Sequence, residues 1–469
     1  MPQETTLRPR QVYALVQDQP MIVRALPILL GAAYALLLLA LFGPGGMTVD
    51  SFSHWHQGST LDIENWHPPL TAFLMRGAQA LGARSPWPIL IAQAWLLGSG
   101  VCVFLRDSLR APPAKILALS LIVLLTPPVL LHAHMMWKDT WCAVAFVWTC
   151  IYAQRLYAQP APSTWLKFSA WAIVTAALRH NALVLIALLL APLLVRAAWK
   201  RQLDQLVAGL VLAVATFGAP RILERVARAR DLAPVQQIFV HDLAGIEGCN
   251  GFADWPRIES LSVIPREALT RGYTVNEIVP LFDNSHGYPT VNLYEAAPHV
   301  GAIAATWREV VRENPGCYAR HRLAVFNRLL GADGGPTCYA YESRVGANQY
   351  GIASFAWWPR ATALVQAIGN ALENTILFRL WFYVVIGIAL FAYFARERNL
   401  GLCACLAAAL AYQLAYFFVA TTCDFRLGSA LVIAVWLGAM VWASQCMPNA
   451  VSRDDASNAG HRRRRVFGQ

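Results

Sequence analysis

Charge is scarce in this chain, and that scarcity excludes an ordinary soluble protein. Only 14% of the 469 residues are charged, whereas 57% are hydrophobic and the mean hydropathy is +0.42. This composition indicates a polytopic membrane protein. The formal charge of +11 could suggest nucleic acid, but the basic residues flank apolar segments and form no single patch. We therefore expect no nucleic-acid partner.

Three sequence signals are also missing. The ten cysteines include no C-x-x-C pair with zinc-ligand spacing, which argues against a metal ribbon. No small-x-small cleavage site follows residues 21–42, so we expect an uncleaved first span. No internal repeat is visible, although transporters are often built from repeated halves.

Long apolar segments are what the chain has in abundance, and they predict an α-helical membrane protein with about ten transmembrane helices. The expected spans are 21–42, 86–105, 116–131, 140–156, two within 165–195, 205–219, 375–395, 399–419 and 427–446. The expected regions are a cytoplasmic segment 1–20, a membrane domain 21–219 with outer loop 43–85, an extracytoplasmic domain of mixed structure 220–374, membrane helices 375–446 and a cytoplasmic basic tail 447–469. Lysine and arginine concentrate on the predicted cytoplasmic side, as the positive-inside tendency requires.

The segment 165–195 has two interpretations. A single long helix would bury Arg179-His180-Asn181 at the middle of the bilayer, at a cost of several kcal/mol. Two short spans that meet at this triplet would place it at the outer interface. We predict the two short spans.

The first outer loop gathers carboxylates, imidazoles and indoles at a membrane face. We expect Asp50 to act as a general base, since a carboxylate in a partly dry cleft can have its pKa raised toward working pH. His67 is a second candidate catalytic residue, and Trp66 is a candidate substrate contact. Alternatively, Asp50 is a helix N-cap, and the tryptophans only anchor an interfacial helix.

Basic residues recur at the other predicted outer helix ends. Lys138, Arg179 and Arg426 are placed to receive a phosphate, with Asn181 beside them. Asp139 is a further catalytic candidate and Asp424 a further substrate contact, but each could instead neutralise its basic neighbour. The pairs His54/His56 and His132/His134 could suggest a divalent cation. Their i, i+2 spacing does not place both rings on one helix face, so we expect no metal and no other cofactor.

The predicted outer domain offers two further sets of residues. His241 and Asp242 either face the active cleft or pack the domain onto the membrane part. Cys249, Cys317, Cys338 and Cys423 face an oxidising compartment under this topology, so we expect a Cys317–Cys338 disulfide and a Cys249–Cys423 disulfide. The alternative is that all four are reduced and buried.

Four short motifs resemble those of the GT-C class of membrane glycosyltransferases, which includes protein O-mannosyltransferases and lipid A aminoarabinose transferases. They are Trp66-His67-Pro68, Trp137-Lys138-Asp139, Arg179-His180-Asn181 and Asp424-Phe425-Arg426. The resemblance implies a polyprenyl-phosphate-linked sugar as donor, Asp50 as the base and the basic residues as ligands of the leaving phosphate. Two departures are that Ser51 follows Asp50 where many members have Glu, and that His67 replaces a lysine.

The sequence therefore predicts an inverting glycosyltransferase in the bacterial cytoplasmic membrane, with its active site facing the periplasm. Its partners would be membrane lipids, the lipid-linked sugar and a glycan, lipid or protein acceptor. The alternative is a transporter or flippase of a lipid-linked glycan, which should carry polar groups along a path through the membrane. A third interpretation is a non-catalytic assembly protein that works through its outer domain.

Overall fold

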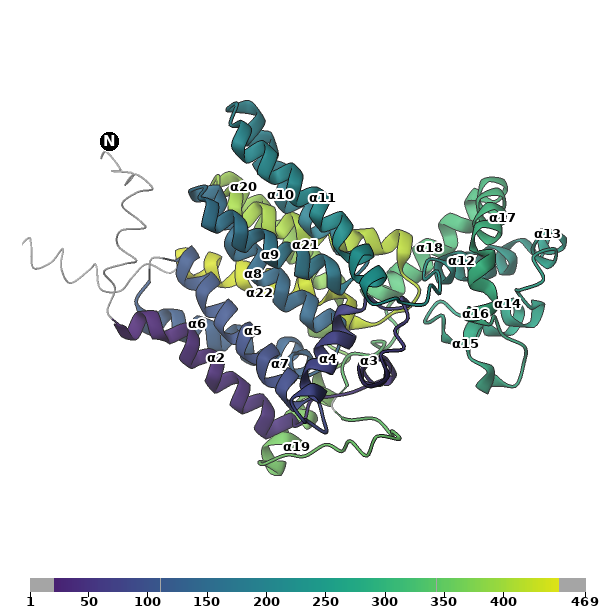
Figure 1. The fold of residues 1–469 in the computed structure, drawn as a ribbon, viewed down its shortest axis with the longest axis horizontal. Helices are drawn as coiled ribbons and strands as arrows, with labels where there is room; N and C mark the ends of the chain where they lie inside the picture. Colours follow the sequence, from purple (N-terminus) through teal and green to yellow (C-terminus); the bar gives the residue numbers. More distant parts are fainter. Residues whose placement is uncertain (1–20, 110, 343, 447–469) are drawn as a thin grey trace, which may run out of the picture.

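A bundle of apolar helices and a smaller helical lobe make up the protein (Figure 1). The computed structural model describes residues 21–109, 111–342 and 344–446. The predicted cytoplasmic segment 1–20 and basic tail 447–469 lie outside the described residues. Between these limits the structure contains helices and isolated bridges, and no strand.

Helices occupy all ten predicted spans. They are α2 (Met21–Phe42), α5 (Trp87–Ser108), α6 (Pro113–Leu125) with α7 (Pro127–Ala133), α8 (Lys138–Ala158), α9 (Pro162–Leu178), α10 (Leu183–Trp199), α11 (Leu203–Val226), α20 (Leu380–Arg396), α21 (Leu400–Val419) and α22 (Ser429–Cys446). Among the described residues, five helices are long and apolar enough to cross a membrane, or six with α6 and α7 taken as one span. The protein is thus a multi-pass membrane protein, and ten complete crossings remain a prediction.

The span expected at 116–131 is bent instead of straight. Helix α6 ends at Leu125 and α7 begins at Pro127, with an angle of 72° between them. A residue that precedes proline is pushed into an extended conformation, and Thr126 has φ −60° and ψ 137°. The Thr126-Pro127-Pro128 sequence therefore accounts for the bend.

The predicted helix break at Arg179–Asn181 is present, because α9 ends at Leu178 and α10 begins at Leu183. Helix α11 is longer than the predicted span 205–219 and continues through Pro220 to Val226. Its outward side carries exposed apolar residues along most of its length, including Val207, Val211 and Val214. Such a surface suits contact with lipid.

The lobe has its own apolar core and is helical, so the prediction of mixed structure was wrong. Its elements are α12 (Gln236–Asn250), α13 (Trp255–Glu259), α14 (Arg266–Gly272), α15 (Val279–Phe282), η1 (Asn284–His286), α16 (Leu293–Ala296), η2 (Ala297–His299), α17 (Val300–Glu313) and the first half of α18 (Pro315–Leu330). In α17 the buried residues Ile303, Thr306 and Val310 recur at helical spacing. For the fold of the lobe, this helical periodicity is more informative than the many Gly, Pro and Asn residues, which lie in its loops.

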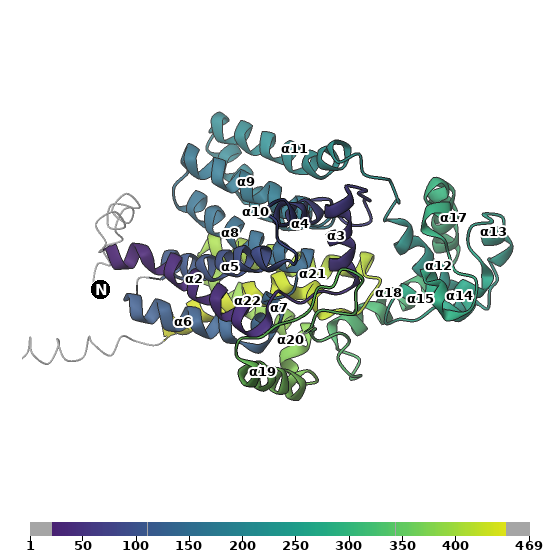
Figure 2. The same ribbon diagram turned by 60° about the horizontal axis from the view of Figure 1, so that its bottom comes forward.

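The range 220–374 contributes to two cores. The second half of α18, with Val325 and Phe326, packs into the core of the bundle, as do Ala340 and Ile352. Helix α19 (Pro359–Leu372) contacts α2 and α7, and Figures 1 and 2 both place it against the bundle and away from the lobe. After α18 the chain therefore returns to the outer surface of the bundle.

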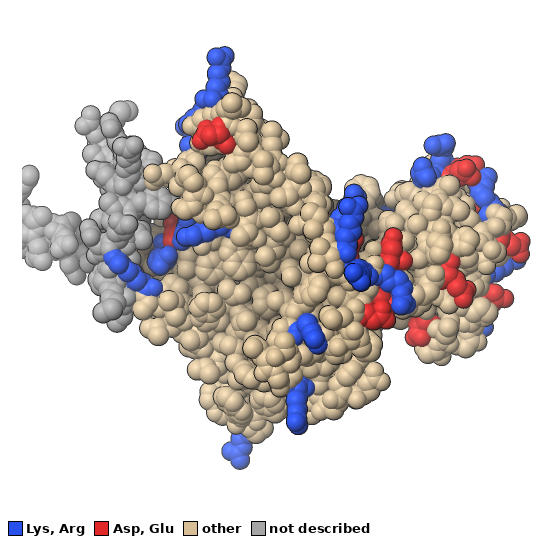
Figure 3. Space-filling view, in the orientation of Figure 1, with Lys and Arg blue, Asp and Glu red and all other residues tan. Residues whose placement is uncertain are grey.

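Charge is distributed unevenly over the face seen in Figure 3. The middle of the bundle is almost free of charged side chains there, while the lobe carries both signs. Two short helices, α3 (Val49–Thr60) and α4 (Leu70–Ala80), form the outer loop beside the lobe. The bundle therefore offers an apolar band suited to lipid, with polar elements beyond its end.

Candidate active site

The polar side chains that the sequence singles out meet where helices of the bundle end beside the lobe. They come from the start of α3, the loop 61–69, the start of α8, the break 179–182 and the turn 420–428. Eight predicted residues form one connected group, here called the charged cluster: Asp50, His67, Lys138, Asp139, Arg179, Asn181, Asp424 and Arg426. Helix ends bring these residues together from distant parts of the sequence.

Asp50 lies in the first turn of α3, but it is not the helix cap. The N-cap is Thr48, whose hydroxyl accepts a hydrogen bond from Trp137 Nε1 at 2.9 Å. Ser51 Oγ donates to the carbonyl oxygen of Met136 at 3.0 Å, which fixes α3 to the segment before α8. The Asp50 carboxylate is thus left for the charged cluster, and 30% of its side chain is exposed.

Each carboxylate oxygen of Asp50 faces a different partner. Oδ2 lies 3.0 Å from Arg426 Nη1, and Oδ1 lies 3.5 Å from His67 Nε2. Burial acts to raise the pKa of Asp50, but Arg426, then His67 and Lys138 outweigh it and hold that pKa well below its ordinary value. The expectation of a raised pKa was therefore wrong, and Asp50 is ionised.

His67 connects Asp50 to Lys138. Burial, reinforced by the Lys138 charge, lowers the pKa of His67 to about 4, so the imidazole is neutral at pH 7. Lys138 Nζ contacts His67 Nδ1. Because the ionised Asp50 carboxylate can only accept, the proton of the neutral His67 is on Nε2 and points toward Asp50, which leaves Nδ1 as an acceptor.

Asp139 is the deepest carboxylate of the charged cluster. Its side chain is 4% exposed, pairs with Arg179 through Oδ1 and lies 3.9 Å from Arg426 Nε through Oδ2. Asp424 Oδ2 is closer to the same Arg426 nitrogen, at 2.8 Å. Asp139 therefore serves as a counter-ion for two arginines, and its depth makes it a poorer base candidate than Asp50.

Two aromatic contacts that the sequence did not indicate support the arginines. Tyr412 donates to Asn181 Oδ1 at 3.3 Å, which also accepts from Arg179 Nε at 3.3 Å. Trp137 lies under the Arg426 guanidinium, 4.8 Å from ring centroid to Cζ. Tyr412 stands four residues before Tyr416 within an apolar helix, and this i, i+4 polar pair was the available signal.

His241 and Asp242 lie outside the charged cluster, in a second polar network that is wholly buried. Both oxygens of Asp242 are 2.7 Å from the Arg322 guanidinium, and Oδ1 lies 3.1 Å from His321 Nε2. Arg322 Nη1 also donates to the Ala420 carbonyl oxygen at 2.9 Å. This network joins the lobe to the end of α21, so the packing interpretation fits both residues.

Trp66 is next to His67 in the chain but is turned toward the lobe, where its ring meets Phe282 edge-on at 6.2 Å. The residues before it pair with the chain that follows α11. Arg230 N donates to Ile63 O at 2.8 Å, and Asn65 N donates to Arg230 O at 3.0 Å. The loop that carries His67 is thus fixed by backbone hydrogen bonds to the segment that connects α11 to the lobe.

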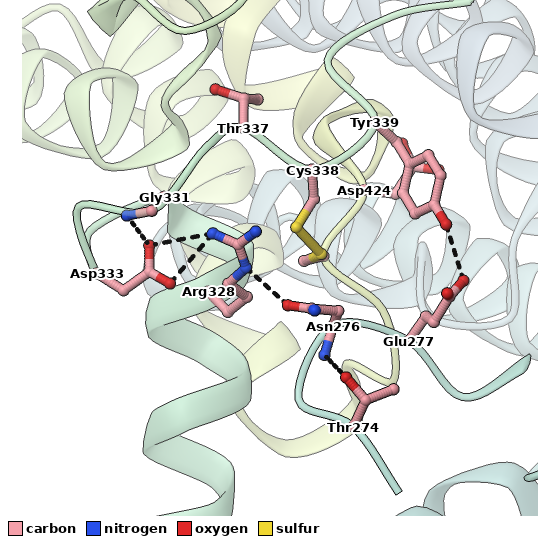
Figure 4. Close-up of a disulfide and its surroundings, with 12 residues drawn as sticks. Thr274, Asn276, Glu277, Arg328, Gly331, Asp333, Thr337, Cys338, Tyr339 and Asp424 are labelled. Carbon is pink, nitrogen blue, oxygen red and sulfur yellow. Dashed lines mark hydrogen bonds and ion pairs between the residues drawn. A yellow bond between two sulfur atoms is a disulfide. The ribbon is translucent and has the colours of Figure 1, made fainter. Parts of the chain in front are cut away.

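The four outer cysteines form two disulfides, but not the predicted ones. The bridges are Cys249–Cys317 and Cys338–Cys423, so Cys317–Cys338 and Cys249–Cys423 were wrong. Closeness along the chain was misleading, because α12 packs on α18 and brings Cys249 to Cys317. After α18 the chain turns back to the segment beside Asp424, as Figure 4 shows.

The described residues contain no group of three or more His, Cys, Asp or Glu side chains able to hold a metal ion. His54 is buried in α3 while His56, two residues later, is exposed. The cationic groups of the charged cluster are instead suited to an anion. Lysine and arginine at a membrane surface are common ligands for phosphate.

Comparisons with known proteins add little to this geometry. No protein-family model matches the sequence, and no curated protein matches it. Among solved structures, the chain is similar to the crystal structure of ArnT from Cupriavidus metallidurans in the apo state, with 14% identity over 92% of this chain and 78% of that chain and a TM-score of 0.30. At so low a score, no residue role is taken from that protein.

Proposed function

We propose that this protein is an inverting membrane glycosyltransferase of the GT-C class. It moves a sugar from a polyprenyl-phosphate donor to a hydroxyl of a glycan, lipid or protein at the periplasmic face of the bacterial cytoplasmic membrane. One observation supports this above all: Asp50, an accessible carboxylate, contacts Arg426 within a cluster that also holds Lys138 and Arg179. A base and phosphate ligands at the end of an apolar bundle suit a substrate that is half lipid and half polar.

In the free enzyme both arginines of the charged cluster are already paired with carboxylates. Arg426 contacts Asp50, Asp139 and Asp424, while Arg179 pairs with Asp139. A donor phosphate must therefore compete with a carboxylate for a guanidinium. Asp50 is the carboxylate to be replaced, because it is more exposed than Asp139 and Asp424.

Replacement of Asp50 at Arg426 prepares the base. Its Oδ2 loses the Arg426 partner and becomes free for an acceptor hydroxyl, while Oδ1 still faces His67 Nε2. Loss of the closest cation and arrival of a phosphate charge both raise the pKa of Asp50. The donor thus binds first and gives Asp50 its basicity.

The chemical step then runs at the anomeric carbon. Asp50 Oδ2 takes the proton of the acceptor hydroxyl, and the hydroxyl oxygen forms a bond to the anomeric carbon from the face opposite the phosphate. The bond from that carbon to the phosphate oxygen breaks, and its electron pair leaves with polyprenyl phosphate. Arg426 and Lys138 stabilise the charge that develops on the phosphate, and configuration at the carbon inverts.

Replacement of Asp50 tests this proposal. Asp50→Asn should abolish transfer while the protein stays folded, with a modest fall in melting temperature from the lost ion pair, because an amide still fits the site and Arg426 keeps Asp424 as a partner. Asp62→Asn is the matched control, since Asp62 is an exposed carboxylate of the same loop that pairs with Arg230. The measurements are mass spectrometry of surface glycans and lipid A from a deletion strain that carries each variant, and release of polyprenyl phosphate in vitro.

Two outcomes would contradict this proposal, the first for the role of Asp50 and the second for the enzyme itself. Full transfer by Asp50→Asn would remove Asp50 as the base. Movement of a lipid-linked glycan across vesicles by the wild type, without release of polyprenyl phosphate, would instead identify a transporter or flippase.

A further inference from the structure

Three chain segments cross beside the charged cluster at what is here called the junction, and each contributes two consecutive residues: Asn276-Glu277, Cys338-Tyr339 and Cys423-Asp424. The first residue of each pair holds the junction together. Cys338 and Cys423 form a disulfide, and Cys423 N donates to the Asn276 carbonyl oxygen at 2.8 Å (Figure 4). The segments come from the lobe, the returning chain and the turn before α22, so the junction links all three.

The junction is braced from α18. Arg328 Nε donates to Asn276 Oδ1 at 2.8 Å, and Arg328 Nη1 pairs with Asp333 at 3.2 Å. In Figure 4 these residues lie on one side of the disulfide. The backbone of the junction is therefore fixed without help from Tyr339 or Glu277, whereas the side chain of Asp424 also accepts from Arg426 N at 3.0 Å and caps the turn that follows.

The second residues of the three pairs lie together on the other side of the disulfide (Figure 4). Tyr339 donates its hydroxyl proton to Glu277 Oε2 at 2.9 Å. Burial, then Glu277 and Asp424, raise the pKa of Tyr339 to about 12, which keeps the phenol protonated. Asp424 in turn holds Arg426 at 2.8 Å, so this group continues directly into the charged cluster.

Tyr339 has two features that packing does not explain. The residue is 56% exposed. Its φ is +43°, in the left-handed region that is unfavourable for a bulky side chain. Seven other non-glycine residues among those described also have a positive φ, so the exposure of the Tyr339 ring beside the charged cluster is the feature that points to a ligand.

We propose that Tyr339, Glu277 and Asp424 form a sugar-binding subsite beside the phosphate ligands. This rests on the proposed glycosyl transfer and adds the residues that recognise the sugar. A tyrosine face stacks on the C–H side of a pyranose or furanose ring, and carboxylates accept hydrogen bonds from its hydroxyls. Since Asp424 joins the subsite to Arg426, the ring would lie next to the phosphate group.

The test compares lipids with and without a sugar. Detergent-solubilised full-length protein is titrated with polyprenyl phosphate and with polyprenyl-phosphate hexoses and pentoses. Tyr339→Asn should weaken binding of the preferred sugar-bearing lipid about tenfold, the loss of roughly one stacking contact with its hydrogen bonds, and bare polyprenyl phosphate less than twofold. Glu277→Gln should act the same way, whereas Arg426→Ala should weaken both lipids.

A stability measurement separates recognition from folding. Asparagine tolerates a positive φ, so Tyr339→Asn should keep or raise the melting temperature while it lowers sugar affinity. Tyr288→Asn is the matched control, because Tyr288 is a lobe tyrosine that bonds to Pro280 O at 3.0 Å, away from the junction. It should leave affinity for every lipid unchanged.

The same variants are titrated with methyl glycosides to distinguish a donor sugar from an acceptor sugar. A tenfold loss confined to the lipid-linked sugars assigns the subsite to the donor, and one confined to the glycosides assigns it to the acceptor. Equal losses for sugar-bearing and bare lipids, or no loss in either series, would overturn the subsite. Neither result would contradict the proposed function, which is tested separately by Asp50→Asn.

Discussion

At the scale of single residues, the charged cluster alternates carboxylates and cations. Asp50 and Asp424 flank Arg426, and Asp139 separates Arg426 from Arg179. A charge of either sign is costly at a membrane surface unless it is paired, so the alternation keeps the site stable before substrate arrives. It also means that substitution of any one charged residue changes the pKa values of the residues paired with it.

The pH dependence of transfer should show how the neighbouring cations affect the pKa of Asp50. The folded pKa of Asp50 is depressed, so its contribution to stability is present above the ordinary aspartate pKa of about 3.9 and is lost only as pH falls through the lower folded value. The acid limb of kcat/KM for the donor, which reports the free enzyme, should therefore lie well below the acid limb of kcat, which reports the donor complex.

Arg426→Gln should move the kcat/KM limb upward, because Arg426 is the strongest cause that lowers the pKa of Asp50. Arg257→Gln, which removes an exposed lobe arginine paired with Glu313, should leave both limbs in place. An acid limb that stays fixed in Arg426→Gln would contradict the role of Arg426 as the partner of Asp50.

Most members of the charged cluster could be named from the sequence, because they interrupt apolar segments at predicted helix ends on one side of the membrane. The protonation of Asp50 could not be, since it depends on Arg426, which lies far away along the chain. Tyr339 and Glu277 gave no signal either. An exposed tyrosine in a loop becomes informative only once its neighbours in space are known.

At the scale of elements, helix ends were predictable and connections were not. Apolar length and the Arg179-His180-Asn181 triplet located the break between α9 and α10. The lobe was misjudged because its loops are rich in Gly, Pro and Asn, although α17 shows a clear helical period. Disulfide pairing failed for a related reason: it depends on the path of the chain after α18, which local sequence does not encode.

The two disulfides differ in what they hold, and this difference can be measured. They separate their cysteines by 68 and 85 residues, so each should stabilise the fold to a similar extent, about 4–5 kcal/mol in the chain-entropy model. Only Cys338–Cys423 adjoins Asp424. The double variant Cys338→Ser/Cys423→Ser should therefore lose affinity for the sugar-bearing donor, while Cys249→Ser/Cys317→Ser should lose stability alone.

Donor titrations and melting curves of both double variants provide the check. Affinity lost equally in the two would mean that general loosening of the lobe is responsible. Unchanged affinity in Cys338→Ser/Cys423→Ser would mean that Arg328 and the Asn276 backbone suffice to hold the junction.

At the scale of the whole molecule, the lobe and the bundle share one buried joint. Arg322 bonds to Asp242 in the lobe and to the Ala420 carbonyl at the end of α21. Removal of one partner from such a buried pair typically costs 3–5 kcal/mol, because the other charge is left uncompensated. This joint fixes the lobe relative to the bundle. It lies close to the site, because Ala420 is only four residues before Asp424. The proposed chemistry does not require the lobe to move.

Under the proposed function, helix α11 links the thickness of the bilayer to the charged cluster. Its uncharged stretch between Asp204 and Arg221 has 16 residues, which span about 24 Å at the helical rise, less than a typical hydrocarbon core of about 30 Å. The chain just beyond it is paired to the loop of His67 through Arg230, Ile63 and Asn65. A thicker bilayer would increase this mismatch, displace the end of α11 and pull on that loop, so transfer in vesicles should peak at one acyl-chain length. Asn65→Ala removes the side-chain hydrogen bonds to Asp231 and Leu232, so transfer by this variant should depend less on acyl-chain length. An equally sharp optimum in Asn65→Ala would show that bilayer thickness does not act on transfer through this loop.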